Sequence, residues 1–190
     1  MIFLKKIAVY CGAAKGNDPI YVESAKRLGI WLVENNIGLV YGGGKFGLMG
    51  VIASTVMNNG GHVDGIIPQE LADRGASDHS ISNLQVVENM TVRKKVMMEL
   101  ADGFIALPGG PGTLEEISEV YSWSIIGDNN KPCILFNVNH YYDNLQKMYD
   151  QMVEEGFLVH EARQKLLFTD SLESISQFIE SYTPPEIREY

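Results

Sequence analysis

Short apolar segments alternate along the chain with longer segments in which apolar residues recur every three or four positions. The first pattern is typical of buried strands and the second of amphipathic helices. Six strands are predicted in this way, at residues 5–11, 38–41, 62–67, 84–87, 104–107 and 133–137. Helices are predicted at residues 19–36, 47–59, 92–101, 112–126, 141–155 and 172–181. This alternation predicts an α/β fold in which helices cover both faces of a parallel sheet.

Turn and cap residues set several of these boundaries. Asp18 can cap the first helix, with Pro19 as its first residue. The polar, aperiodic residues 73–82 predict a flexible loop near the functional site. Ligands of parallel α/β sheets bind beyond the carboxyl ends of the strands. The site is therefore expected in the segments after strands one, two, four and five.

Length and composition favour one globular domain at residues 1–182, followed by a polar tail at 183–190. The net charge of −9 argues against a nucleic-acid partner, because binding a nucleic-acid backbone needs a clustered basic surface. A small phosphate ligand needs only a local site and remains compatible with that charge. Cys11 and Cys133 lie in apolar runs and are predicted to be buried, reduced thiols.

The apolar N-terminal stretch is interrupted by Lys5 and Lys6 and is too short for a signal or membrane segment. No run of 18 apolar residues occurs in the sequence. A cytoplasmic protein without a membrane partner is expected.

Two glycine-rich turns, at residues 41–50 and 108–116, each lie between a predicted strand and a predicted helix. Backbone amides at a helix N-terminus are unpaired, and the helix dipole favours an anion there. Glycines let a phosphate approach the main chain, and the Thr113 hydroxyl can add a donor. Two such turns in one sheet predict a phosphate site that includes Gly43 and Gly44 in the first turn and Gly109, Gly110 and Gly112 in the second.

Two familiar nucleotide motifs fit the first turn poorly. Gly42, Gly44 and Gly47 match the spacing of a dinucleotide fingerprint, but they follow the second strand rather than the first. The next strand carries its acid, Asp64, in the middle rather than at the end where a ribose would be held. No lysine stands at the spacing of a P-loop. A nicotinamide-dependent oxidoreductase is therefore disfavoured.

Charged residues gather around the second turn. Arg93-Lys94-Lys95 opens a helix, where positive charge is mildly unfavourable unless it meets a negative partner or ligand. Glu115 and Glu119 are four residues apart and share a helix face, whereas Glu116 points elsewhere. Spacing alone leaves open which side faces the phosphate. The four histidines are scattered and show no metal-ligand spacing.

Three motifs together resemble the Lonely Guy family of cytokinin riboside 5′-monophosphate phosphoribohydrolases, members of which have carried a lysine decarboxylase label. The similarity extends over roughly residues 5–157. Its motifs are Tyr-Gly-Gly-Gly-x-x-Gly-Leu-Met-Gly at 41–50, Met-x-x-Arg-Lys at 90–94 and Pro-Gly-Gly-x-Gly-Thr-x-x-Glu at 108–116.

The resemblance implies a Rossmann-like three-layer α/β/α fold, a homodimer, and hydrolysis of nucleoside 5′-monophosphates such as AMP to free base and ribose 5-phosphate. It implies that Arg93 and Glu116 are catalytic. It places substrate binding at Lys94 and at the turn from Gly109 to Glu115. Such chemistry fits these residues, because a carboxylate can stabilise an oxocarbenium-like ribose and activate water without a metal or another cofactor.

Departures from the family pattern concern the pocket wall. Thr91 and Val92 stand where many members carry His-Glu, Pro111 replaces an aromatic residue, and Ile125 replaces a glutamine. These changes bear on base preference more than on reaction type. Pyridoxal-dependent decarboxylation is disfavoured, because Lys45, the one candidate for a Schiff base, lies at a loop tip. A non-catalytic nucleotide-binding protein is the remaining alternative.

Overall fold

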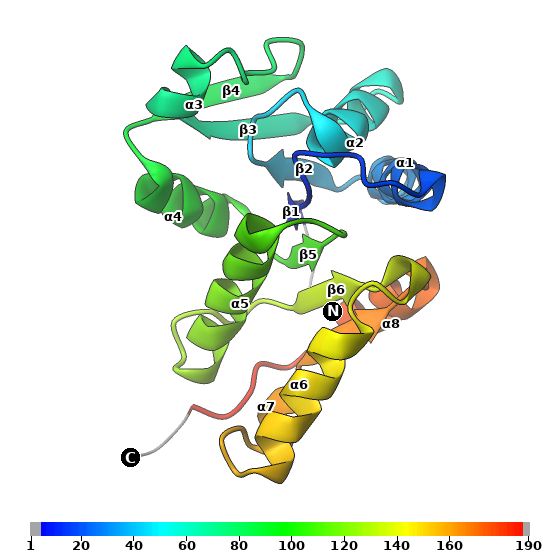
Figure 1. The fold of residues 1–190 in the computed structure, drawn as a ribbon, viewed down its shortest axis with the longest axis vertical. Helices are drawn as coiled ribbons and strands as arrows, with labels where there is room; N and C mark the ends of the chain where they lie inside the picture. The colour runs from blue at the N-terminus through cyan, green and yellow to red at the C-terminus, as the bar shows by residue number, and fades with distance from the viewer. Residues whose placement is uncertain (1–4, 188–190) are drawn as a thin grey trace.

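The computed structural model describes residues 5–187, which form one three-layer α/β/α unit (Figure 1). Within them the chain forms β1 (Lys6–Tyr10), α1 (Pro19–Glu34), β2 (Gly38–Tyr41), α2 (Gly47–Asn58), β3 (Val63–Pro68), α3 (Gln69–Asp73), β4 (Asn83–Val87), α4 (Met90–Leu100), β5 (Phe104–Ala106), α5 (Pro111–Ile125), β6 (Cys133–Phe136), the 3₁₀ turn η1 (Val138–His140), α6 (Asp143–Glu154), α7 (His160–Arg163), β7 (Leu166–Thr169) and α8 (Leu172–Ser181). The predicted Rossmann-like fold class is confirmed.

The sheet of the described residues has seven parallel strands in the order β4-β3-β2-β1-β5-β6-β7. Strand β1 is central, and its Ala8 pairs with Val40 of β2 on one side and Phe104 of β5 on the other. The chain runs outward from β1 to β4 and then returns to β5. Crevices at such a reversal are where open α/β sheets bind ligands.

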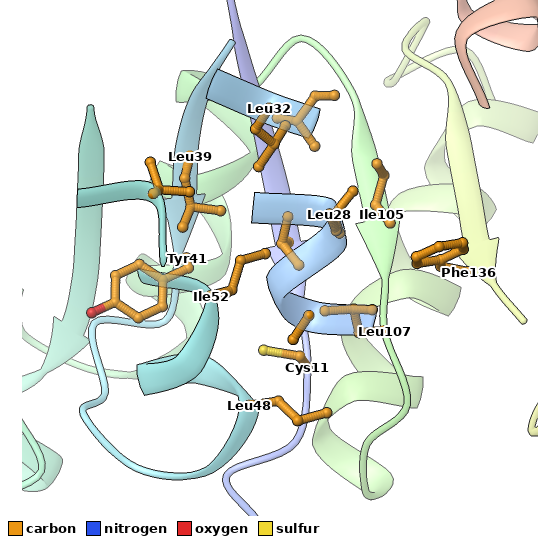
Figure 2. Packing of buried hydrophobic residues seen from close by; sticks show 14 of the residues in the cluster. Cys11, Leu28, Leu32, Leu39, Tyr41, Leu48, Ile52, Ile105, Leu107 and Phe136 are labelled. Carbon is orange, nitrogen blue, oxygen red and sulfur yellow. The ribbon is translucent and has the colours of Figure 1, made fainter. Parts of the chain in front are cut away.

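Successive residues of each strand face opposite layers, as the pleat of a strand requires. Ile7 and Val9 of β1 pack in one core with helices α1, α2 and α8, whereas Ala8 and Tyr10 pack in the other with α4, α5 and α6. Figure 2 shows the first core, where Leu28 and Leu32 of α1 lie over the sheet. Figure 1 shows α1 and α2 on one side of the strands and α4 and α5 on the other.

Local signals in the sequence mark the start of α1 correctly and the start of α5 to within one residue. The Asp18 carboxylate accepts a hydrogen bond from Ile20 N at 3.0 Å, with Pro19 as the first residue of α1. Helix α5 likewise begins at a proline, Pro111, one residue before the predicted start. Proline is favoured in a first helical turn because its missing N–H is not needed there. Cys11 and Cys133 are both buried and unbonded to each other, as predicted.

Four elements were not predicted: α3, the 3₁₀ turn η1, α7 and β7. The strand Leu166–Thr169 has only one buried side chain and lies at a sheet edge, so it lacks the apolar contrast of the central strands. Helix α3 occupies 69–73, so the predicted loop begins one residue too early. Both short helices fall below the length at which helical periodicity can be recognised.

Residues 74–82 are more ordered than a free loop. Lys45 N donates to Ala76 O at 3.0 Å, Asp78 N donates to Gly43 O at 3.0 Å, and Gly44 forms an antiparallel bridge with Ser77. Ser77 and Asp78 are buried. The prediction of flexibility is therefore wrong for this part of the segment, because its backbone is paired with the first glycine-rich turn. The same pairing places the segment next to the candidate site, as expected.

The terminal segments are only partly described. Residues 1–4 of the apolar N-terminal stretch and residues 188–190 of the predicted tail lie outside the described range. Residues 183–187 have no regular structure, but Pro185 is buried, so the described part of the tail is not purely a solvated segment. Within residues 5–187, no helix has the length and hydropathy to cross a bilayer.

Candidate active site

Three glycine-containing turns meet beyond the carboxyl ends of β1, β2 and β5. Gly12, after β1, donates its N–H to Pro108 O at 3.1 Å and accepts from Leu48 N at 3.0 Å. These bonds join the turn after β1 to the turn after β5 and to the start of α2. The sequence predicted the two glycine-rich turns, but the contribution of Gly12 became visible only in the fold.

The second turn has two kinds of glycine. A side chain at Gly109 would collide with Thr113 Oγ1 and would come within 2.9 Å of Gly12 N, so this glycine permits close packing. Gly110 and Gly112 face open space within 4 Å of where a Cβ would stand. Gly110 is the N-cap of α5 and makes no side-chain cap, which leaves the first amides of a 15-residue helix facing that space. A phosphate can approach the backbone here.

The first turn is used differently. Gly43 has φ +71° and lies against Ile66 and Ile67 of β3, and both Gly43 and Gly44 are buried. Gly42 packs against Arg93, because a Cβ there would lie 2.6 Å from Nη2. The described contacts therefore give these glycines a packing role. Binding of substrate by Gly43 and Gly44 stays a prediction.

Arg93 and Glu116 form a buried ion pair between α4 and α5. Arg93 Nη2 donates to Glu116 Oε1 at 2.6 Å, and the two side chains are only 10% and 8% exposed. Asn89 fixes the start of α4 by accepting from Val92 N at 3.0 Å, which places Arg93 in the first helical turn facing inward. Charge-assisted hydrogen bonds of this kind are short and strong.

The environment of Glu116 has opposing effects on its acidity. Burial favours the neutral carboxyl, and the positive charge of Arg93 opposes this effect. The negative charge of Glu115 has a smaller effect, which also favours the neutral form. The net result is a pKa of Glu116 raised above its ordinary value. A carboxylate with a raised pKa beside an open anion-binding turn has the properties of a general base.

Lys94 forms ion pairs with the other two glutamates, Glu115 and Glu119. Its Nζ lies 2.7 Å from Glu115 Oε1 and 2.9 Å from Glu119 Oε2. Hydrogen bonds that Lys94 donates to both carboxylates raise the pKa of Lys94. The prediction that Glu115 and Glu119 share one helix face while Glu116 points elsewhere is confirmed. Lys95, the third basic residue, is exposed and lies 3.9 Å from Glu99.

Two tyrosines that sequence reasoning did not assign to the site hold the second turn from the opposite side. Tyr141 OH donates to Gly109 O, and Tyr142 OH donates to Leu107 O at 2.7 Å. Between α5 and α6 lies a cavity of about 360 Å³, whose lining includes Leu114, Tyr141 and Leu145. The Tyr-Tyr pair in the sequence was a signal, but neither hydroxyl could be matched to a carbonyl without the fold.

The described residues hold no cluster of three or more His, Cys, Asp or Glu arranged to bind a metal ion. Lys45 is exposed and packs over the Phe46 ring at 5.4 Å.

A buried arginine–carboxylate pair lies near the N-terminus of α5 in a Rossmann-like sheet. This arrangement is typical of enzymes that bind phosphorylated nucleotides. The chain matches the family model described as "Possible lysine decarboxylase" over residues 49–179. It is 43% identical to cytokinin riboside 5′-monophosphate phosphoribohydrolase LOG1 of Arabidopsis thaliana, over 95% of this chain and 84% of that protein. It is 42% identical to the enzyme LOG of Oryza sativa subsp. japonica, over 95% and 74% of the two chains.

The chain therefore belongs to the Lonely Guy family, as its motifs predicted. Its fold is also similar to solved structures of more distant sequence. The molybdenum cofactor binding protein from Rippkaea orientalis superposes with a TM-score of 0.69 at 20% identity, over 93% of this chain and 95% of that one. The molybdenum cofactor carrier protein of Chlamydomonas reinhardtii gives the same TM-score at 16% identity, over 93% and 98%. These two likenesses establish the fold.

Proposed function

We propose that this protein hydrolyses the N-glycosidic bond of nucleoside 5′-monophosphates, cytokinin riboside 5′-monophosphates among them, to free base and ribose 5-phosphate. The observation that carries the proposal is the buried pair between Arg93 of α4 and Glu116 of α5, because Glu116 lies on the helix that begins at the open turn around Gly110 and Gly112. The names of the family's relatives supply the substrate class.

In the proposed reaction, the 5′-phosphate binds the amides at the start of α5, around Gly110, Gly112 and Thr113. The ribose then lies beside Glu116, one helical turn further along. As the bond between C1′ and the base breaks, positive charge develops on the ribose, and the carboxylate stabilises it. Water adds to C1′ and loses a proton to Glu116, the departing base takes up one proton from solvent, and Glu116 releases its proton to solvent, so that one water is consumed in each turnover.

Arg93 and Lys94 have distinct parts in this proposal. Arg93 holds the Glu116 carboxylate in place, and its positive charge favours the ionised carboxylate against the effect of burial on the pKa. Lys94 holds Glu115 and Glu119 on the neighbouring face of α5, and its ammonium offsets part of their negative charge at the edge of the proposed phosphate site. Glu115 thus acts through Lys94 at the edge of the binding site, and Gly43 and Gly44 support the opposite wall.

The competing function is nucleotide binding without catalysis. A binding site gains nothing from a buried carboxylate next to a bound phosphate, because two negative charges repel each other. The purified protein incubated with AMP, with an N6-prenylated AMP and with adenosine separates the two functions by product analysis. Release of free base with ribose 5-phosphate supports the hydrolase, whereas saturable binding of AMP without any release supports the binding protein.

We also infer a cytoplasmic homodimer without a nucleic-acid or membrane partner. The family resemblance supports the dimer, and the net charge of −9 argues against a nucleic-acid partner. Leu100 of α4, Trp123 of α5 and Ile126, directly after α5, are 36%, 37% and 46% exposed and offer apolar surface to a second copy. Light scattering after size-exclusion chromatography measures the mass directly. A monomer at all concentrations would contradict the dimer.

A further inference from the structure

The guanidinium of Arg93 has an unusual set of partners. Nη2 donates to Glu116 Oε1, and Nη1 donates to the thioether sulfur of Met90 at 3.3 Å. Nε is buried and has no hydrogen-bond partner within residues 5–187. Buried arginines normally satisfy their donors with oxygen acceptors, so the sulfur contact and the unpaired Nε require an explanation.

Met90 is held in register with Arg93 by α4 itself. It is the first residue of the helix, and residues three apart lie on the same helix face. The Asn89 cap fixes that first turn through Val92 N. Gly42 lies close to Nη2, since a Cβ there would come within 2.6 Å of that atom. Met90 and Gly42 therefore lie against the two different terminal nitrogens of the guanidinium.

A thioether is a weak hydrogen-bond acceptor and carries no charge. It can orient Nη1 without neutralising the guanidinium, whereas a second carboxylate would compete with Glu116. The full positive charge of the guanidinium is then directed at Glu116.

We propose that Met90 is a positioning residue for the proposed hydrolysis, in which its sulfur orients Arg93 toward Glu116. The inference rests on the proposed function for its catalytic consequence, but the orientation of Arg93 has a consequence of its own in the free protein. Poorer placement of Arg93 weakens the stabilisation of the ionised Glu116 carboxylate.

Other charged or titratable groups also act on Glu116 and stay constant in this comparison. They are Lys94 on α4, Glu115 and Glu119 on α5, Tyr10 at the end of β1 and Cys11 directly after it. Burial raises the pKa of Tyr10 and of Cys11, so both stay neutral at physiological pH. Removing the sulfur of Met90 changes none of these groups directly. A shift in Glu116 titration would therefore report on Arg93.

The test replaces Met90 with leucine, which keeps the apolar volume and removes the acceptor. We expect kcat for AMP to fall roughly 2- to 10-fold, the range that corresponds to loss of one modest hydrogen bond. The acid limb of the kcat profile should move to higher pH. Titration of ¹³C-labelled Glu116 by NMR, without substrate, should show the same upward shift. Met90→Gln restores an acceptor at similar length and should recover both readouts in part.

Met57→Leu is the matched control. Its sulfur also accepts a hydrogen bond, from Ser82 Oγ at 3.3 Å, but it lies on α2 away from Arg93. This change should leave kcat and the titration of Glu116 unaltered. If Met90→Leu shifts neither the acid limb nor the titration, or lowers only the melting temperature, the positioning role is wrong. If the wild type releases no base while the NMR shift still appears, the proposed function fails and the positioning of Arg93 stands.

Discussion

Arg93 Nη2 lies 2.6 Å from Glu116 Oε1, although 23 residues separate the two in the chain. The contact joins the first turn of α4 to the second turn of α5 across the reversal point of the sheet. Both side chains are about nine-tenths buried, so each depends on the other for compensation of its charge. This mutual dependence leads to the first two predictions.

Glu116→Gln removes the negative charge while keeping the shape and a hydrogen-bonding oxygen. Electrostatic stabilisation of a transition state is typically worth about 10²-fold or more in kcat. We therefore expect release of adenine from AMP to fall by at least about that factor while AMP still binds. Glu115→Gln is the matched control, because Glu115 is 58% exposed and contacts Lys94 instead. Near-normal kcat in Glu116→Gln would overturn the assignment of the carboxylate.

Arg93→Met leaves Glu116 buried without the arginine charge that opposes desolvation, so the pKa of Glu116 rises further. A carboxyl whose folded pKa exceeds its unfolded value contributes its full stability below the unfolded pKa and loses it as pH rises through the folded pKa. The free energy of unfolding of the variant should therefore fall by about 3–5 kcal/mol at pH 7. The loss should be smaller at pH 5. Urea denaturation at both pH values measures this difference.

The double variant Arg93→Met with Glu116→Gln supplies the control for that measurement. It carries no charge at either position, so most of the pH-dependent loss should disappear. An equal loss at both pH values in the single variant would show that packing, rather than the unpaired carboxylate, causes the destabilisation.

The open second turn predicts different outcomes for neighbouring glycines. A methyl group at Gly112 meets nothing within 4 Å, and alanine favours a helix by about 0.5–1 kcal/mol over glycine. Gly112→Ala should fold normally but raise KM for AMP, because the methyl group occupies the space in which the phosphate approaches. Gly109→Ala should instead lower the melting temperature through its collision with Thr113. Unchanged KM in Gly112→Ala would place the phosphate elsewhere.

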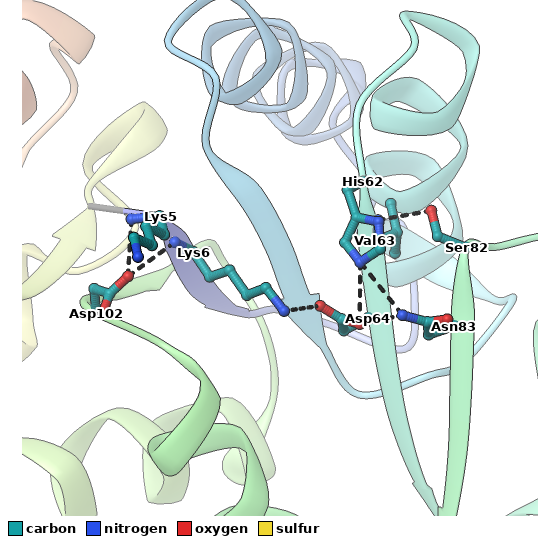
Figure 3. Close-up of polar contacts among 8 residues, drawn as sticks. All are labelled: Lys5, Lys6, His62, Val63, Asp64, Ser82, Asn83 and Asp102. Atoms are coloured by element: carbon teal, nitrogen blue, oxygen red, sulfur yellow. Dashed lines mark hydrogen bonds and ion pairs between the residues drawn. The ribbon is translucent and has the colours of Figure 1, made fainter. Parts of the chain in front are cut away.

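Lys6 and Asp64 form an ion pair far from this turn, at the start of β1 and β3 (Figure 3). Burial favours the neutral Asp64 carboxyl, but hydrogen bonds from Lys6, Asn83 and His62 outweigh burial and lower its pKa. The stability that they give is present above the unfolded pKa of Asp and is lost as pH falls through the folded pKa.

Lys6→Met should therefore lower the free energy of unfolding by about 1–3 kcal/mol at pH 7. The difference from wild type should shrink in acid, where Asp64 is protonated in both proteins. Thermal denaturation between pH 3 and pH 7 checks this, with Lys95→Met, an exposed lysine, as a control that should change little. A constant difference across that range would contradict the account.

Activity should persist in EDTA and without added pyridoxal phosphate or NAD, because the proposed steps use only protein side chains and water. Base release from AMP, measured before and after chelation and dialysis, checks this expectation. Reversible loss of turnover on chelation, restored by a divalent cation, would show that the reaction needs a metal ion.

The sequence alone determined the fold class and the main elements. The central strands, such as 38–41, are buried on both faces and therefore consist of continuous apolar residues. Such a run can be identified as a strand from the sequence without knowing which strands pair with it. Asp18, Pro19 and the glycine-rich turns act within a few residues of themselves, so their local effect can also be predicted. The family motifs then selected Arg93 and Glu116 as the expected catalytic pair.

Tertiary structure decided which of these residues meet. Spacing placed Glu115 and Glu116 about 100° apart on one helix, but only the packing of α4 against α5 assigned Lys94 to one and Arg93 to the other. The contacts of Arg93 with Met90 and Gly42, and of Tyr141 with Gly109, likewise depend on how distant segments fold together. Periodicity describes one element at a time, whereas these contacts arise where the sheet brings several elements to one edge.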